Sequence, residues 1–78
     1  MLTEFIYLKN IPQAVQFTRL MLKFSGRTEL ICEDIVIDAK SLLSVIGLAV
    51  GRSMRLSVNT EDADDMIYEL SAFQGNQR

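Results

Sequence analysis

The chain has 78 residues and a net charge of −2, with 49% of its residues hydrophobic and 23% charged. These values predict one domain spanning residues 1–78, and they argue against a disordered chain or a broad basic surface for nucleic acid. One cysteine excludes an internal disulfide, no apolar run approaches the ~20 residues of a membrane span, and residues 1–8 lack the basic run of a signal peptide. We therefore expect a cytoplasmic protein that binds neither nucleic acid nor membrane.

The first third of the chain predicts a strand followed by a helix. Residues 2–8 are apolar and rich in β formers. Asn10 is a favourable N-cap, Pro12 is tolerated in a first turn, and the helix is expected to run to about Phe24. Gly26 could then adopt the left-handed conformation that ends many helices. The expected buried stripe of this helix comprises Ile11, Ala14, Val15, Thr18, Met21 and Leu22.

The middle of the chain predicts an antiparallel hairpin. Residues 28–33 and 35–38 are expected to form two strands joined by a tight turn at residues 33–34. Alternation separates two sets of apolar side chains, Leu30, Cys32, Ile35 and Ile37 on the buried face and Ile31 and Val36 on the outer face. The outer pair is interpreted as ordinary surface hydrophobes rather than a dimer interface, so a monomer or weak dimer is expected.

The last part of the chain predicts a helix, a strand and a final helix. The second helix of the chain is expected to begin near Lys40 or Ser41 and to end near Gly51. Residues 53–59 alternate between apolar and polar side chains, which predicts a strand. Thr60 can cap the final helix, followed by acidic residues and by the expected buried residues Ala63, Met66, Ile67, Leu70 and Phe73. The fold class is therefore α+β, an open-faced β-sandwich of order β-α-β-β-α-β-α. In it, a four-stranded antiparallel sheet carries three helices on one face.

The stretch from Asp38 to Val50, DAKSLLSVIGLAV, resembles the second-helix signature of the HPr family. These are phosphocarrier proteins of the bacterial sugar phosphotransferase system. The spacing of elements from Gly26 to Val58 is similar to that of the family throughout. The resemblance implies an HPr-like fold and a role in sugar transport regulation or carbon catabolite control.

The departure from the family lies where its chemistry should be. The family opens its first helix with Gly-x-His-Ala-Arg-Pro-Ala, whereas residues 9–14 here read KNIPQA. Asn10 stands near the histidine position and Pro12 near the arginine position, and only Ala14 matches. The chain contains no histidine, and an asparagine amide is a very poor nucleophile compared with a neutral imidazole. We therefore expect no phosphohistidine, no catalytic residue and no enzymatic activity.

Ser41 is the main candidate for a functional residue. The resemblance implies that it is the target of an HPr kinase/phosphorylase, with a transcriptional regulator as a further partner. A phosphate there would lie at a helix start, next to Lys40. The alternative is that Ser41 is only a helix N-cap in a degenerate adaptor that is never phosphorylated. Both interpretations stay open.

The apolar residues of the second predicted helix are candidates for a partner surface. So short a helix cannot bury all of them, so we expect Leu43 with Leu42 or Ile46 to be exposed. Val45, Leu48 and Ala49 are expected to pack inward, and Phe17 and Leu20 to extend the exposed patch. In HPr relatives the equivalent patch docks on partner proteins, and the resemblance implies the same role for these residues.

The sequence predicts no metal site and no cofactor. Cys32 has no histidine or second cysteine to join it in a zinc site or a catalytic pair, so it is expected to be a buried small hydrophobe. The acidic residues 61–65 do not have the spacing of a calcium loop, and Gly47 and Gly51 do not form a phosphate-binding loop.

Overall fold

The structure is a computed structural model that describes residues 2–59 and 68–73. Its elements are β1 (Leu2–Tyr7), α1 (Ile11–Met21), β2 (Arg27–Cys32), β3 (Ile35–Asp38), α2 (Leu42–Leu48), β4 (Ser53–Asn59) and the 3-10 helix η1 (Ser71–Phe73). Residues 68–70 are helical and lead directly into η1. The predicted order of elements is confirmed. Thr60, the acidic residues and the other predictions for residues 60–67 lie outside the described residues.

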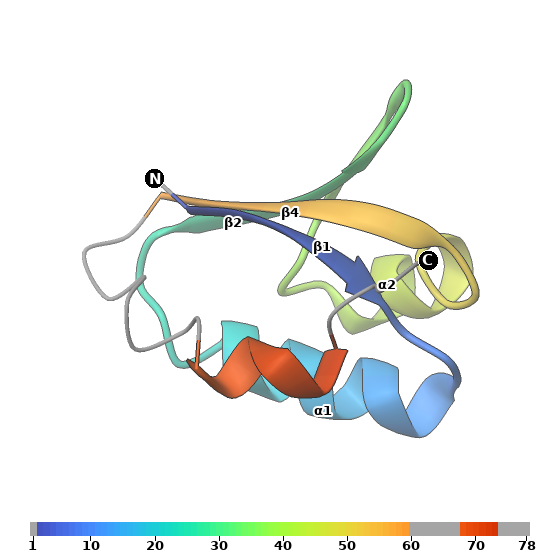
Figure 1. Cartoon of the computed structure of the whole chain (residues 1–78), viewed down its shortest axis with the longest axis horizontal. Helices are drawn as coiled ribbons and strands as arrows, with labels where there is room; N and C mark the ends of the chain where they lie inside the picture. Colours follow the sequence, from blue (N-terminus) through green and yellow to red (C-terminus); the bar gives the residue numbers. More distant parts are fainter. Residues whose placement is uncertain (1, 60–67, 74–78) are drawn as a thin grey trace.

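The four strands form one antiparallel sheet in the order β1-β4-β2-β3. Figure 1 shows α1, α2 and the helical segment that ends in η1 on one face of this sheet, while no helix of the described residues covers the other face. The predicted open-faced α+β sandwich is therefore confirmed. No helix within the described part of the chain is long and apolar enough to cross a membrane.

The core lies between the sheet and the helices. The inward side chains of β4 (Met54, Leu56 and Val58) are at most 1% exposed, as their alternation predicts. Phe17 of α1 packs edge-to-face against Phe73 of η1, with ring centroids 5.7 Å apart and an interplanar angle of 82°. This contact joins the first helix to the end of the described chain.

The buried face of α1 differs from the predicted stripe. Its buried residues are Ala14, Phe17, Thr18, Leu20 and Met21. Ile11 and Leu22 were expected in the core but are exposed, so that part of the prediction is wrong. Successive residues of a helix are rotated by about 100° about its axis. The observed buried face of α1 is rotated from the predicted one, toward Phe17, by less than this angle. On this side Phe17 contacts the Phe73 ring, which lies far along the sequence.

The hairpin of β2 and β3 follows the sequence closely. The bounds of β3 are those predicted, and the turn falls at residues 33–34, where Glu33 has a φ of 54°. Leu30 is fully buried, whereas Cys32 is only half-buried, because the hairpin tip projects beyond the body of the molecule (Figure 1).

The two helices end by different means. Gly51 follows α2 with a φ of 81°, in the left-handed region that suits glycine. The corresponding prediction for Gly26 is wrong, since Gly51 is the glycine with positive φ among the described residues. Instead α1 ends at Met21 and tightens into i→i+3 hydrogen bonds, from Lys23 N to Leu20 O and from Phe24 N to Met21 O.

Candidate functional site

Asn10 caps α1. Its extended backbone (φ −158°, ψ 175°) precedes the helix, and its Oδ1 accepts a hydrogen bond of 3.0 Å from Gln13 N. The Gln13 side chain reaches back, and its Oε1 accepts a 3.0 Å bond from Lys9 N. This reciprocal arrangement is a variant of the capping box. The amide of Asn10 is therefore engaged in starting the helix.

The first turn of α1 offers little to an anion. Among its first three residues, Pro12 has no N–H, and the N–H of Gln13 is bonded to Asn10. Only the Ile11 amide remains of the donors that a phosphate would use at a helix start. The first three residues of α1 therefore do not offer a full set of free amide donors.

Ser41 is the N-cap of α2, as its residue type predicts. Its Oγ donates to Ser44 Oγ at 3.2 Å and accepts from Ser44 N at 3.5 Å, which is long for a capping bond. The side chain is half-buried. Ser41 is therefore a half-buried cap whose hydroxyl is held by two long hydrogen bonds.

Lys40 directs its charge away from the start of α2. Its ammonium donates to the backbone carbonyl of Phe24, three residues after the end of α1, and its backbone N–H donates to Asp38 Oδ1 at 2.9 Å. A phosphate on Ser41 would have to compete with the Phe24 carbonyl for this ammonium. Lys40 precedes Ser41 in the sequence, but only the fold shows that the Lys40 ammonium contacts the Phe24 carbonyl.

The exposed apolar side chains of α2 lie where the sequence predicted, with one exception. Leu43 is 85% exposed and Leu42 is 37% exposed, whereas Val45 and Ala49 are buried. Leu48 was expected to pack inward but is 38% exposed. On a helical wheel Val45 and Ala49 define the inward side, and Leu42 and Leu48 flank it on either side. Both flanks are therefore only partly covered.

Phe17 and Leu20 do not extend this patch. Both are buried in the core, so their prediction as partner-binding residues is wrong. Ile11, in contrast, is 53% exposed in the first turn of α1. No sequence signal marked Ile11, because the 3.6-residue period placed it on the buried stripe.

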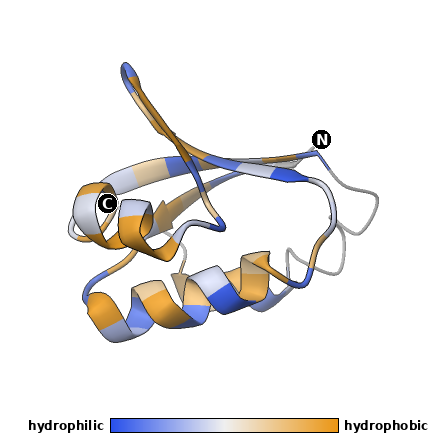
Figure 2. Cartoon of the chain, turned by 180° about the vertical axis from the view of Figure 1, so that it is seen from behind, coloured by the Kyte–Doolittle hydropathy of each residue, from blue (hydrophilic) through white to orange (hydrophobic). Residues whose placement is uncertain are grey.

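The chain itself brings the start of α1 to the end of α2. Leu8 forms an isolated bridge with Val50, and Gly51 N donates to Leu8 O at 2.8 Å. Figure 2 shows hydrophobic colouring on α2 and on the first turn of α1 at the same end of the molecule. We call this region the α2 surface and define it by Ile11, Leu42, Leu43, Ile46 and Leu48, of which Ile46 is half-buried.

No group of three or more metal-ligating side chains occurs among residues 2–59 and 68–73. The half-buried thiol of Cys32 stands alone in this part of the chain as well.

The same fold occurs in the crystal structure of HPr-C-His from Thermoanaerobacter tengcongensis, with a TM-score of 0.74. The match covers 92% of this chain and 89% of that chain at 24% sequence identity. At this identity the likeness establishes an HPr-like fold. No protein-family model and no curated protein matches the chain.

Proposed function

We propose that the chain is an HPr-like interaction module, related to the sugar phosphotransferase system, that binds protein partners and does not carry phosphohistidine. The observation behind this proposal is Leu43, a large apolar side chain that is 85% exposed on a helix whose neighbours Leu42 and Leu48 are also partly exposed. Clusters of this kind on small proteins usually mark interaction surfaces. The HPr-like fold supports a protein partner.

The lack of histidine separates this function from phosphate transfer. Phosphoryl transfer through an imidazole needs a histidine, and the chain has none. Asn10 fills the nearest position with a capping amide. Incubation with phosphorylated Enzyme I should therefore leave the mass of the protein unchanged, and a gain of one phosphate would overturn this part of the proposal.

Family resemblance suggests two kinds of partner, an HPr kinase/phosphorylase and a transcriptional regulator of carbon catabolite control. With such a kinase, Ser41 would be the modified residue. A phosphate there would replace the weak contacts with Ser44 and would change the charge beside Leu42 and Leu43. In the alternative, the protein is an adaptor with the same binding surface and no phosphorylation.

Intact-mass measurement after incubation with an HPr kinase/phosphorylase and ATP distinguishes the two versions. The switched version predicts a gain of one phosphate in the wild type and none in Ser41→Ala. A wild type that stays unmodified would leave the adaptor as the proposed function.

Binding tests the α2 surface separately from phosphorylation. The kinase/phosphorylase is titrated against wild type, Leu43→Ser and the control Val36→Ser, which alters an exposed apolar residue on the opposite face of the sheet. We expect Leu43→Ser to weaken binding by about tenfold or more, a loss of about 1.4 kcal/mol, and Val36→Ser to leave it unchanged. Equal binding by all three proteins would contradict the assignment of this surface.

A further inference from the structure

The outer face of the sheet, opposite the helices, carries one apolar row with an arginine in it. In the strand register Arg55 on β4 lies between Phe5 on β1 and Ile31 on β2. Ile31 in turn lies next to Val36 on β3. Phe5 and Val36 are exposed, whereas Ile31 is half-buried. Because neighbouring strands are about 5 Å apart, the side chains of one row can touch the same small molecule.

A cavity of about 350 Å³ extends from this row toward the turn between β2 and β3. Its volume falls near the lower end of the range for small-molecule sites, roughly 300–1,000 Å³. The next row of the outer face is polar, so the apolar surface is narrow compared with the roughly 800 Å² that each partner buries in a stable protein complex. That polar row consists of Thr3, Ser57, Glu29 and Asp38. The residues that line the cavity are Phe5, Ile31, Cys32, Glu33, Ser53 and Arg55.

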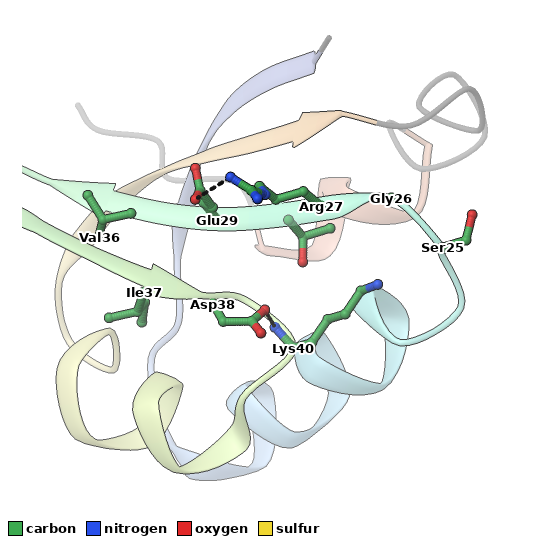
Figure 3. A pocket seen from close by; sticks show the side chains of 9 residues that line it. Ser25, Gly26, Arg27, Glu29, Val36, Ile37, Asp38 and Lys40 are labelled. Carbon is green, nitrogen blue, oxygen red and sulfur yellow. Dashed lines mark hydrogen bonds and ion pairs between the residues drawn. The ribbon is translucent and has the colours of Figure 1, made fainter.

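The guanidinium of Arg55 has no polar partner in the described part of the chain. Arg27, on the same face, lies beside Glu29, with Nη1 3.9 Å from Oε2 (Figure 3). Arg55 instead has apolar register partners on both sides. Glu33 also borders the cavity, but it forms no ion pair with Arg55. A ligand that complements this surface therefore needs an acidic group for Arg55 and an apolar part for the side chains next to it.

We propose that this cavity binds a small aromatic carboxylate, a free acid with one ring and a short chain. Its carboxylate accepts hydrogen bonds from the guanidinium of Arg55, whose fork geometry suits a carboxylate. Its ring packs against Phe5, one strand spacing away, and Ile31 lines the other side of the cavity. The site shares no residue with the α2 surface and does not depend on the proposed function.

Titration of the ¹⁵N-labelled protein with 3-phenylpropionate, followed by NMR, tests the site directly. We expect saturable shifts of the amides of residues 4–6, 30–33 and 53–56, with a Kd on the order of 1 mM, as suits a ligand of few atoms. Propionate, which lacks the ring, and 3-phenylpropanol, which lacks the charge, should each bind at least about tenfold more weakly. Binding of the alcohol as tight as that of the acid, or no saturable shift in these residues, would overturn the proposal.

Two arginines on the same face provide a matched pair of variants. Arg55→Gln removes the charge from the cavity and should weaken binding of 3-phenylpropionate by about tenfold or more. Arg27→Gln removes a charge outside the cavity and should leave the Kd unchanged. Phe5→Thr keeps a β-forming residue but loses the ring, so it should also weaken binding. Wild-type binding by Arg55→Gln, or equal weakening by both arginine variants, would contradict the site.

A second copy of the chain is the alternative occupant of the outer face. In that case the same amides would shift as the protein concentration is raised without ligand, and sedimentation would show a dimer. We expect instead a monomer whose amide spectrum stays constant from micromolar to millimolar protein. A dimer that buries Phe5 and Arg55 would overturn the proposed small-molecule site.

Discussion

The helices α1 and α2 start in similar ways but differ in how firmly they are capped and in what they expose. Asn10 caps α1 through a 3.0 Å bond that Gln13 reinforces, and the helix behind it carries buried residues such as Phe17. Ser41 caps α2 through a 3.5 Å bond, and the helix behind it exposes Leu43. A polar residue at a helix start is therefore not by itself a site. Its hydrogen bonds and the face behind it decide whether it holds the fold or remains available to a partner.

The largest expected effect is that of Phe17→Ala in α1. Phe17 is fully buried against Phe73, so its truncation should cost about 3–5 kcal/mol and leave so small a domain largely unfolded in water. Urea denaturation measures the loss. A small loss of stability would indicate that Phe17 is not part of the core, and it would contradict the distinction between the two helices. The double-mutant cycle with Phe73→Ala should show a coupling of about 1 kcal/mol for the edge-to-face pair.

Asn10→Ala tests the cap of α1. It removes the acceptor for Gln13 N and should lower the free energy of unfolding by about 1 kcal/mol. Asn10→Asp, which keeps a capping oxygen, is the matched control and should remain close to the wild type in urea denaturation. If both variants are equally destabilised, the loss does not come from the capping bond.

Ser41→Ala should be milder than Asn10→Ala. The capping bond it removes is long, so the expected loss of stability is at most about 0.5 kcal/mol, the lower end of the range for N-caps. The same urea measurement compares the two helix starts directly. A loss as large as that of Asn10→Ala would mean that Ser41 holds α2 as firmly as Asn10 holds α1, and the comparison would fail.

Leu43→Ser is expected to have the smallest effect on stability. The side chain is 85% exposed, so its replacement should change the free energy of unfolding by less than about 0.5 kcal/mol. Leu43 is therefore suited to binding experiments, because lost affinity cannot then be attributed to a damaged fold. A large destabilisation would show that Leu43 packs against the protein and is not a free contact.

Local signals in the sequence predicted the parts of the site that depend on neighbours in the chain. Asn10 and Ser41 were identified as N-caps from their residue types, and β3 was placed with its observed bounds by alternation and a turn. The exposure of Leu43 followed from the number of apolar residues in a short helix. Each inference concerns groups a few residues apart, whose contacts the backbone period fixes.

The tertiary structure decided what depends on distant segments. The buried face of α1 is the one that packs into the core and includes the contact of Phe17 with the distant Phe73 ring, so Phe17 and Leu20 are buried and Ile11 is exposed. The ammonium of Lys40 lies at the Phe24 carbonyl, 16 residues earlier in the chain. The sequence by itself determined the order of elements and the helix caps, and it contains no histidine. Only folding set the rotation of each helix about its axis and the partner of each long side chain, because both depend on groups that meet only in the folded chain.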